Sequence, residues 1–379
     1  MSGGMELYLH MPFCVRKCAY CDFLSFPSGA KTQRMYAKRL MEDIDVMGKR
    51  YGEIPVETIF IGGGTPSVPD SGLIVEIMEH VRHAFHVADG AEISMEANPG
   101  TVTREKLTDY RKAGINRLSF GLQSANDREL KLLGRIHTWA EFLESFTLAR
   151  ECGFANLNID LMSALPGQTC ESWKETLSRV TDLDPEHISA YSLIIEEGTP
   201  FGERYGSEEG RKLLPDEDSE REMYHETKRF LKDCGYERYE ISNYAKPGRE
   251  CRHNIGYWTG VPYLGLGLGA SSYLDGCRFT VNPDMKQYLE EKPGMFTDIE
   301  KLTKKDMEEE FFYVGLRMTA GVSLSEFERR FGISAKEVYP GLMETFVKEK
   351  AARFEGDRFV LTDYGLDVSN YIMAQFLQD

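Results

Sequence analysis

Three of the eight cysteines lie close together, in the pattern Cys14-x3-Cys18-x2-Cys21, and the other five are scattered singly. No basic and apolar segment of the secretory type precedes this group, so its thiols indicate a metal centre or catalysis rather than disulfides. An iron–sulfur cubane held by three cysteines leaves one iron free for a non-protein ligand, and the spacing favours this interpretation. Zinc is the alternative, because His10 could complete a Cys3His site of four protein ligands.

Glycines and a carboxylate follow two of the predicted strands. The run GGGTP at 62–66 comes directly after the second strand. It lacks the later Gly and Lys of a P-loop, so it predicts either a tight turn or a close approach of the backbone to a ligand. Glu96 ends the third strand. A carboxylate there either caps the strand or balances the charge of a cationic ligand.

Three more polar side chains are associated with the fourth and fifth strands, namely Gln123, Arg135 and Asp160. Amide, guanidinium and carboxylate groups suit the hydroxyls of a ribose and the carboxylate of an amino acid, because arginine binds a carboxylate through two parallel hydrogen bonds. Arg135 is equally compatible with an ordinary cation at a helix end. Tyr8 and Tyr20 flank the cysteines and are candidates either for packing on a ligand or for the aromatic core.

The segment CRHNIGYW at 251–258 places a histidine among aromatic residues. Histidine can be an axial ligand of heme iron, with aromatic neighbours beside the macrocycle. His253 is therefore a candidate metal ligand. The alternatives are that His253 forms hydrogen bonds that shape the site, or that Cys251 supplies a thiolate ligand instead.

These residues must be positioned by alternating strands and helices. The β-rich runs are 5–10, 56–61, 92–97, 117–122, 156–161 and 187–195. The segments with helical spacing are 31–50, 70–87, 103–113, 138–152 and 170–183. Repeated strand–helix units predict a parallel sheet with right-handed crossovers. Six units in this length favour an α/β fold with a partial (β/α)6 TIM-like barrel, and a doubly wound open sheet is the rival; in both, the chemistry lies at the carboxyl ends of the strands.

The rest of the chain predicts an extension of this core and a separate C-terminal unit. A charged excursion at 203–222 overlaps a helix at 216–234, and 263–274 is apolar with three glycines that indicate tight backbone packing. A capping box at Ser323 and Glu326, a helix near 334–350, a hairpin around 355–357 and a terminal helix predict a winged-helix-like α+β domain. The domain boundaries that follow are 1–215, 216–299 and 300–379.

The composition argues against a nucleic-acid-binding protein and against a membrane-spanning one. The 379 residues carry 45 Lys+Arg against 61 Asp+Glu, a formal net charge of −16. This excess of acid argues against nucleic acid as a partner, including at the C-terminal domain, because nucleic-acid binding depends on basic side chains that neutralise phosphates. No apolar run approaches the ~18 residues of a membrane-spanning helix. A cytoplasmic protein is predicted.

Several motifs together resemble a known family. The segments are HMPFCVRKCAYCDF (10–23), IFIGGGTPS (59–67), MEANPGT (95–101) and RLSFGLQS (117–124), followed by LGRIH (133–137), NIDLMSALPGQT (158–169), YEISNYA (239–245) and CRHNIGYW (251–258). The first four resemble the coproporphyrinogen III oxidase-like branch of the radical S-adenosylmethionine (SAM) superfamily. The others are similar to the heme chaperones of this branch, the HemW subgroup. The resemblance covers residues 5–379.

The resemblance implies two cofactors and the residues that hold them. Cys14, Cys18 and Cys21 would ligate a 4Fe–4S cluster whose fourth iron binds SAM through its amino and carboxylate groups. One-electron reduction would then cleave SAM to a 5′-deoxyadenosyl radical, chemistry that belongs to the cofactor while the protein supplies position and electrostatics. The SAM contacts carried over are Tyr8, Tyr20, Gly63, Gly64, Thr65, Glu96, Gln123, Arg135 and Asp160. A valine at Gly64 is expected to block SAM and leave the cluster intact.

The resemblance also implies a function in heme trafficking. A chaperone of this kind binds heme, here through His253 and Tyr257, and delivers it to apoproteins such as respiratory cytochromes. The alternative is a radical SAM enzyme of the oxygen-independent coproporphyrinogen III oxidase type. Those oxidases carry a fourth cysteine two positions after the third, where this chain has Phe23, so the resemblance argues against oxidase activity although the SAM residues are present. Peripheral membrane contact and a homodimer are both compatible with the sequence.

Overall fold

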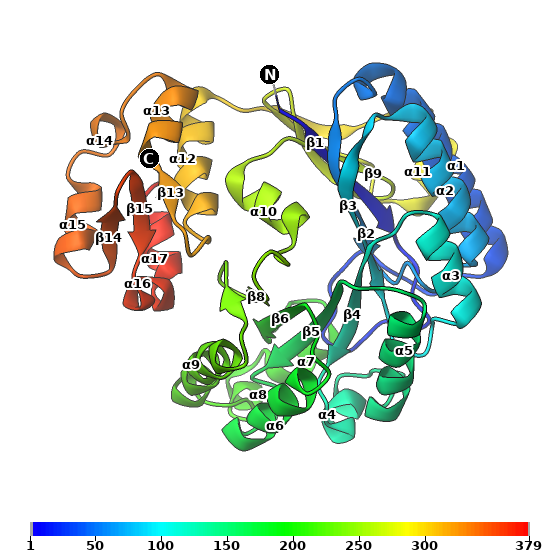
Figure 1. Ribbon diagram of the computed structural model, residues 1–379, viewed down its shortest axis with the longest axis horizontal. Helices are drawn as coiled ribbons and strands as arrows, with labels where there is room; N and C mark the ends of the chain where they lie inside the picture. The colour runs from blue at the N-terminus through cyan, green and yellow to red at the C-terminus, as the bar shows by residue number, and fades with distance from the viewer. Residues whose placement is uncertain (1–2, 378–379) are drawn as a thin grey trace.

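The computed structural model describes residues 3–377, which form one twelve-stranded sheet and a second sheet of three strands (Figure 1). The strands at the centre of the large sheet pair in parallel and in chain order. They are β1 Met5–Met11, β2 Val56–Gly63, β3 Val87–Ala97, β4 Arg117–Gln123, β5 Leu157–Ser163 and β6 His187–Ser192. This is the predicted partial barrel, and within the described residues its sheet stays open.

Helices cross between successive strands and cover the outer face of the curved sheet (Figure 1). They are α1 Ala30–Tyr51, α2 Ser71–Ala84, α3 Arg104–Lys112, α4 Asp127–Leu132, α5 Trp139–Glu151 and α6 Cys170–Thr181. Strands β1, β2 and β4 are almost continuously buried, as expected where both faces of a parallel sheet are covered. Each helix buries one apolar stripe, such as Leu73, Ile74, Ile77, Met78 and Val81 of α2.

The predicted elements match with a few differences at their ends. The second helix, expected to reach residue 87, stops at Ala84, because Phe85 is extended and Val87 pairs with Val56 as the start of β3. The sixth strand ends at Ser192 instead of 195. The short helix α4 was missing from the prediction. It is only six residues long, and a side-chain cap at Asn126 starts it.

Later segments extend the sheet at both edges. Beyond β6 lie β8 Asn243–Ala245 and β7 Glu237–Arg238, both antiparallel, after the small helices α7 Pro200–Tyr205 and α8 Glu208–Arg211 and the long helix α9 Glu217–Asp233. Beyond β1 lies β9 Tyr263–Leu266 in parallel, followed by antiparallel strands and a helix. These are β10 Ser271–Leu274, β11 Cys277–Thr280, α11 Met285–Glu290 and β12 Thr297–Lys301.

The glycines predicted to pack tightly do so at this edge. A Cβ at Gly265 would lie 2.2 Å from the Ser271 carbonyl oxygen, and one at Gly267 would lie 2.4 Å from the Tyr36 hydroxyl. Gly267 also has φ +95, which side-chain-bearing residues rarely adopt. The close approach lets β9 turn directly into β10 beside the first strand.

The C-terminal domain has its own apolar core around Phe312, Phe327, Phe359 and Phe376. Its elements are α12 Lys304–Gly315, β13 Val322–Ser323, α13 Leu324–Phe331, α14 Ala335–Val338, α15 Leu342–Lys348, β14 Ala352–Glu355, β15 Arg358–Leu361, α16 Asp363–Asp367 and α17 Ser369–Ala374. This winged-helix-like arrangement was predicted, but the expected helix 334–350 is divided.

The division has a local cause. Pro340 lacks the N–H that would continue a helix, and Gly341 follows with φ +74. The capping box at the start of α13 is only half formed. Ser323 accepts a hydrogen bond from the Glu326 backbone N–H, while the Glu326 carboxylate pairs with Arg329.

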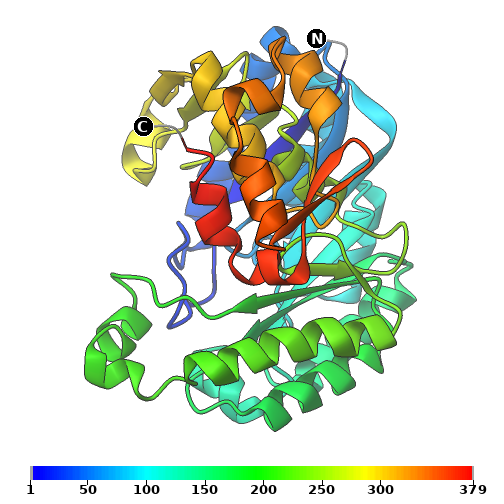
Figure 2. The same cartoon turned by 90° about the vertical axis from the view of Figure 1, so that its left-hand side faces the viewer.

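Figure 2 looks at the C-terminal domain face on and shows it in front of the barrel, with α9 running beneath it. Two contacts join them: Lys228 of α9 pairs with Asp363, and His225 Nε2 of α9 lies 3.3 Å from an Asp367 carboxylate oxygen. On the other side, α10 Arg252–Thr259 packs between the sheet and α12 (Figure 1). Within residues 3–377, none of the helices combines the length and apolar character needed to span a bilayer.

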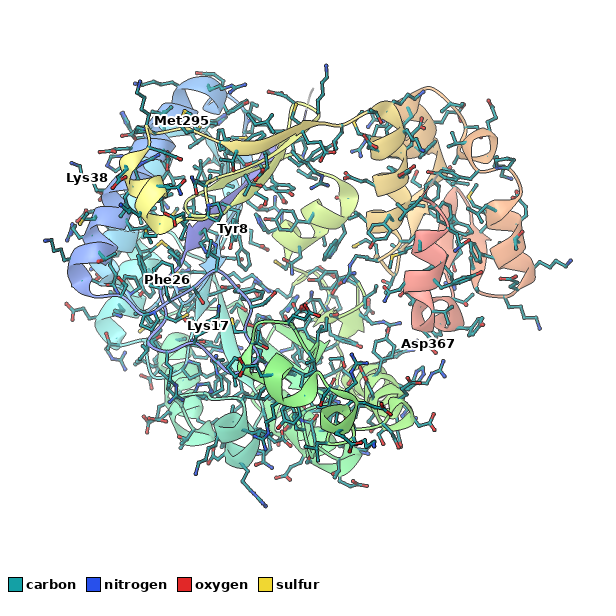
Figure 3. The ribbon with its side chains drawn as sticks, turned by 180° about the vertical axis from the view of Figure 1, so that it is seen from behind. Tyr8, Lys17, Phe26, Lys38, Met295 and Asp367 are labelled. Atoms are coloured by element: carbon teal, nitrogen blue, oxygen red, sulfur yellow. The ribbon has the colours of Figure 1, made fainter. Side chains whose placement is uncertain are left out.

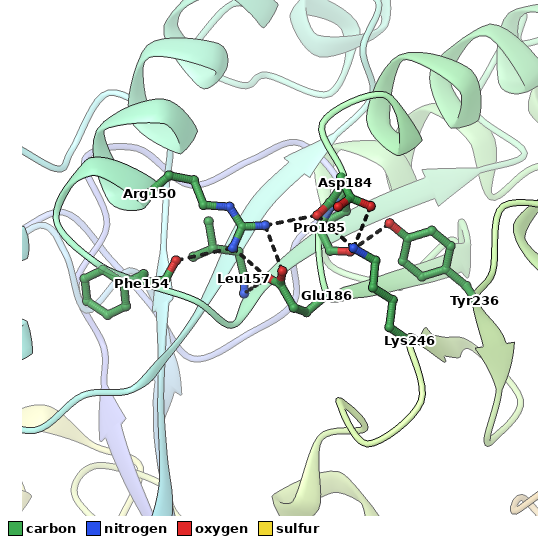
Figure 4. Close-up of polar contacts among 8 residues, drawn as sticks. All are labelled: Arg150, Phe154, Leu157, Asp184, Pro185, Glu186, Tyr236 and Lys246. Atoms are coloured by element: carbon green, nitrogen blue, oxygen red, sulfur yellow. Dashed lines mark hydrogen bonds and ion pairs between the residues drawn. The ribbon is translucent and has the colours of Figure 1, made fainter.

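A polar network fastens the amino ends of β5 and β6 (Figure 4). The Arg150 guanidinium bonds the Glu186 carboxylate at 2.7 and 3.1 Å, and it also reaches the Asp184 carbonyl oxygen at 3.1 Å. Glu186 accepts in turn from the Leu157 backbone N–H at 2.9 Å. Lys246 pairs with Asp184 at 2.6 Å, which ties the segment after β8 to the same corner. This end of the barrel is opposite the strand ends where ligands bind, so the network serves stability.

We predict that Arg150→Ala lowers the free energy of unfolding by about 2 kcal/mol, the scale of hydrogen bonds to charged groups. The side chains of Arg150 and Glu186 are only 28% and 14% exposed, so solvent screens their pair weakly. Urea denaturation measures the change. The control is Arg104→Ala, which removes an exposed, solvent-screened pair with Glu151 and should lower the free energy of unfolding much less. Equal losses in the two variants would contradict the assignment.

Candidate functional site

The cysteines lie on the loop between β1 and α1, which crosses the carboxyl ends of the first strands. Backbone hydrogen bonds fasten this loop to the glycine turn after β2: the Gly64 N–H donates to the Met11 carbonyl oxygen at 2.9 Å, and the Thr65 N–H donates to the Phe13 carbonyl oxygen at 2.7 Å. The Cys14 N–H donates to the Phe26 carbonyl oxygen at 3.1 Å and closes the loop on itself. In Figure 3, Phe26 and Lys17 mark this loop next to Tyr8 of β1.

One cavity, here named the cluster cavity, unites the three cysteines with the polar residues at the strand ends. Its walls include Cys14, Cys18, Cys21, Tyr20, Gly63, Gly64, Thr65, Glu96, Gln123, Arg135 and Asp160. Every residue that the sequence predicted for the cluster and SAM is therefore in one place, except Tyr8. Tyr8 lies on the far side of Glu96, in the two neighbouring cavities described below.

Asn98 connects the walls of this cavity, and sequence reasoning missed it. Its side-chain N–H donates to the Thr65 hydroxyl at 2.9 Å, and its side-chain oxygen accepts from Arg135 at 2.7 Å. Thr65 in turn lies 3.4 Å from the Cys14 sulfur, and Arg135 donates to the Cys18 sulfur at 3.4 Å. The available signal was position, because Asn98 directly follows the carboxyl end of β3 and precedes a proline.

The glycines of the turn are required by the packing of the protein itself. A Cβ at Gly64 would lie 2.7 to 2.9 Å from backbone atoms of Met11 and Phe13, and one at Gly63 would lie 2.3 Å from the His10 ring. Gly63 also has φ +105. The expectation that a valine at Gly64 blocks SAM alone needs correction, since the Cβ collides with the backbone of the cysteine loop and would displace the cysteines too.

Glu96 is the acidic centre of the site. Its carboxylate accepts from the Gly63 N–H at 2.9 Å. Burial, and then the nearby charge of Asp160, raise the pKa of Glu96 to about 8, while the Gly63 hydrogen bond acts in the opposite direction. Burial also raises the pKa of Asp160, although Ser119 and Asn158 donate to it at 2.9 and 2.7 Å. Two buried acids side by side create a strong preference for a cationic ligand.

Gln123 reaches the cavity from a strained backbone. It ends β4 with φ +76, next to an irregular register with β5 between Gly121 and Gln123. A residue other than glycine with positive φ is uncommon and is often found at functional sites. The irregular register re-aims the end of the strand, so the Gln123 side chain joins the cavity wall.

The donor set fits an iron–sulfur cubane. The three thiols are free and half-buried, and Arg135 donates a hydrogen bond to the Cys18 sulfur. Among the described residues, no three His, Cys, Asp or Glu side chains converge closely enough to hold a single metal ion. A cubane requires a wider spacing, because each thiolate binds a separate iron. His10 does not complete a zinc site, since its ring nitrogens bond the Tyr8 hydroxyl at 3.0 Å and the Leu24 carbonyl oxygen at 2.9 Å.

His253 lies in a second cavity, the inner chamber, which is lined by Tyr8, Phe60, Glu96, Arg117, Asp160, His253 and Tyr257. Its side chain is 1% exposed, and both ring nitrogens are bonded: Nδ1 to the Thr58 hydroxyl at 2.7 Å and Nε2 to the Tyr257 hydroxyl at 3.0 Å. Burial, and then the Arg117 cation, lower the pKa of His253 to about 3, so the ring is neutral. Cys251, the alternative thiolate ligand, is fully buried, and burial raises its pKa to about 12.

A third and larger cavity, the inter-domain cleft, separates the sheet from the C-terminal domain. Tyr257, Trp258 and Tyr263 line it on the barrel side, and Met307, Phe311, Met318 and Arg330 line it on the C-terminal side. Its volume is about 770 Å³, within the roughly 300–1,000 Å³ of pockets for small-molecule ligands and cofactors. Phe23, Gly63 and Glu96 line both this cleft and the cluster cavity, so the two adjoin.

Comparison with known proteins agrees with this architecture. Residues 8–180 match the radical SAM superfamily, and residues 302–368 match the HemN C-terminal domain. The chain is 35% identical over 374 residues to the heme chaperone HemW of Bacillus subtilis, with 98% of both chains covered. It is 35% identical over 382 residues to HemW of Escherichia coli, with 99% of this chain and 98% of that one covered. The chain belongs to the HemW family.

Membership of the HemW family confirms the resemblance found in the motifs, and the radical SAM superfamily implies a 4Fe–4S cluster and SAM as cofactors. Among solved structures, coproporphyrinogen III oxidase (HemN) from Escherichia coli, a radical SAM enzyme, has a TM-score of 0.84 at 24% identity. The match covers 99% of this chain and 90% of HemN. At this identity the similarity establishes the fold, including the C-terminal domain. It does not establish the activity of this HemW-family chain, which must be argued from the chain's own site.

We predict that Cys18→Ala prevents cluster assembly, because a cubane needs the third thiolate and Arg135 loses its sulfur partner. Anaerobic reconstitution followed by iron and sulfide analysis should give about four of each per wild-type chain and none in the variant. Cys234→Ala is the control, since Cys234 is an exposed thiol at the end of α9, and it should keep the full content. Stoichiometric zinc in the wild-type protein would contradict the assignment.

Glu96→Gln should change how stability depends on pH in the cluster-free protein. Because the pKa of Glu96 is raised from 4.5 to about 8 in the folded chain, the unfolded chain releases its proton first as pH rises. Folding stability is therefore lost between about pH 4.5 and about pH 8 in the wild type, and the neutral amide avoids this loss. As pH rises through this window, the denaturation midpoint of the variant should increase relative to that of the wild type. A constant difference would show that the Glu96 carboxylate is not buried as described.

Proposed function

We propose that this protein is a heme chaperone. It binds heme in the inter-domain cleft, holds a 4Fe–4S cluster and SAM in the adjoining cluster cavity, and delivers the heme to apoproteins such as respiratory cytochromes. The observation that carries the proposal is the adjacency of the two cavities, whose common wall consists of Phe23, Gly63 and Glu96. HemW relatives at 35% identity over nearly the whole chain support heme as the cargo.

The cluster cavity suits SAM beside the cluster. Cys14, Cys18 and Cys21 would hold three irons, and the fourth iron would bind the amino and carboxylate groups of SAM. The buried acids Glu96 and Asp160 favour a cationic ligand, and the bound cofactor pair supplies one-electron chemistry. Tyr20, Thr65, Gln123 and Arg135 complete the SAM contacts, with Asn98 holding Thr65 and Arg135 in place.

The inter-domain cleft suits a flat, apolar molecule with acidic groups at its edge. Aromatic and thioether side chains form its walls, and these make favourable contacts with a macrocycle. Arg330 enters the cleft from α13, rests 5.8 Å from the centre of the Phe311 ring and pairs with no carboxylate among the described residues. A guanidinium in this position would bind a propionate of heme.

Each of the three predicted domains can be given a role in this arrangement. Residues 1–215 would form the cofactor core, 216–299 would extend the sheet and supply α10 with the HNxxYW motif, and 300–379 would close the cleft. The C-terminal domain therefore provides one wall of the cargo site. An acidic surface excess argues against a nucleic-acid function for this winged-helix-like unit.

We predict that Arg330→Ala weakens heme binding about ten- to hundredfold, the equivalent of one charge-assisted hydrogen bond of about 1.5–3 kcal/mol. Heme titration of cluster-loaded protein, followed by the heme absorption, measures the affinity. Arg329→Ala is the matched control, because this neighbour on α13 is 74% exposed and already pairs with Glu326. Equal effects of the two substitutions would contradict Arg330 as the propionate contact.

The oxidase alternative is tested on the same preparations. Reduced protein incubated anaerobically with coproporphyrinogen and SAM should form no decarboxylated product, since Phe23 stands where the oxidases have their fourth cysteine. Phe23 is 63% exposed and lines both the cluster cavity and the cleft. The replacement of the oxidases' fourth cysteine by Phe23 therefore lies between the proposed cofactor site and the proposed heme site. Product formation with turnover would replace the chaperone proposal by the oxidase.

A further inference from the structure

Two of the three clustered cysteines have a hydrogen-bonding side chain against their sulfur atoms. The Thr65 hydroxyl lies 3.4 Å from the Cys14 sulfur, and Nη1 of Arg135 donates to the Cys18 sulfur at 3.4 Å. These two partners come from different parts of the barrel, Thr65 from the turn after β2 and Arg135 from the loop after α4. Both of them contact the side chain of Asn98, which directly follows β3.

The amide of Asn98 has one orientation that satisfies both partners. A guanidinium donates hydrogen bonds and accepts none, so the side-chain oxygen of Asn98 must face Arg135, where it lies 2.7 Å from Nη2. The amide N–H therefore faces Thr65 and donates to its hydroxyl oxygen at 2.9 Å. Because that oxygen accepts from Asn98, the hydroxyl proton of Thr65 is available to the Cys14 sulfur. A thiolate bound to iron has no proton and can only accept.

The backbone around Asn98 holds the amide in this position. Its N–H donates to the Ser67 hydroxyl at 3.2 Å, and Pro99 restricts the preceding residue to extended conformations. Gly121 of β4 leaves room for the contact. A Cβ there would lie 3.0 Å from the Asn98 side-chain oxygen and 3.3 Å from Nη2 of Arg135. Three successive strand–helix units therefore meet at this one amide.

Hydrogen bonds to the sulfur atoms of an iron–sulfur cluster help to set its reduction potential. One-electron reduction adds negative charge to the cluster and its thiolate ligands. A donated hydrogen bond or a neighbouring cation stabilises that charge and makes reduction easier. The Thr65 hydroxyl and the Arg135 guanidinium are in position to do this at two of the three cysteines.

We propose that Asn98 is a positioning residue that raises the reduction potential of the 4Fe–4S cluster. It directs the Thr65 hydroxyl toward the Cys14 sulfur and holds Arg135 against the Cys18 sulfur. The inference rests on the proposed function, because it takes the three cysteines as the cluster ligands. In the reduction itself the cluster gains one electron, and dithionite, the donor used to test it, is oxidised to sulfite. No protein bond forms or breaks.

The isosteric variant Asn98→Asp tests this arrangement. A carboxylate still accepts from Arg135, but it cannot donate to Thr65, whose hydroxyl would then donate to the carboxylate. Anaerobic titration of the full-length, reconstituted protein with dithionite, followed by the EPR signal of the reduced cluster, measures the potential. The potential of the variant should be more negative, with a reduction equilibrium constant about tenfold smaller, the equivalent of about 59 mV for one electron. Asn98→Ala should shift the potential in the same direction.

Two further variants separate the hydrogen bonds from other effects. Asn370→Asp makes the same change of charge at an exposed position on α17 and should keep the wild-type potential. Thr65→Val removes the hydroxyl and should also lower the potential. Combining Thr65→Val with Asn98→Asp should lower it by less than the sum of the two single shifts, because both changes remove the same bond to Cys14. A purely structural role would not produce this pattern.

Iron and sulfide analysis shows which preparations carry a full cluster. If the wild type assembles none, the proposed function itself fails. If Asn98→Asp and Asn98→Ala carry the cluster at the wild-type potential, the cluster assignment stands and the role of Asn98 is refuted. An equal shift in Asn370→Asp would also refute it, since charge alone would be the cause. Failure of both Asn98 variants to assemble a cluster would show that Asn98 is needed for assembly and would overturn the proposal.

Discussion

The site depends on the backbone pairing between the cysteine loop and the glycine turn after β2. The Gly64 and Thr65 N–H groups donate to the carbonyl oxygens of Met11 and Phe13, which fixes the loop across the carboxyl ends of the strands. This approach leaves no room for a Cβ at Gly64. The positions of the three thiols therefore follow from main-chain geometry, and Thr65, Asn98 and Arg135 refine them through side-chain hydrogen bonds.

Glu96 lies where three cavities of the molecule meet. It lines the cluster cavity, the inner chamber and the inter-domain cleft, and its own position is set by the Gly63 N–H. A buried carboxyl group therefore lies in the wall between the cluster cavity and the inter-domain cleft. Since its pKa is raised by burial, a bound cation is what makes its ionised form favourable.

Much of the fold could be predicted because its signals are local. The strand and helix boundaries follow hydrophobic periodicity and caps, and the cysteine spacing locates the cluster loop. The structure differs where local signals conflict or are weak: Pro340 and Gly341 divide a predicted helix, and the short α4 rests on a single cap at Asn126. Asn98 was missed because its partners, Thr65 and Arg135, come from other strand–helix units.

The amino-acid sequence by itself determined the family, the α/β core and most residues of the cluster cavity, because the three cysteines and the glycine turn beside them occupy short, recognisable motifs. Tertiary structure decided which residues face which cavity. His253 and Tyr257 are one helical turn apart in the same motif, yet packing of α10 against β2 buries the histidine and leaves the tyrosine on the cleft wall. The cleft itself exists only through the placement of the C-terminal domain, a long-range contact that no local pattern encodes.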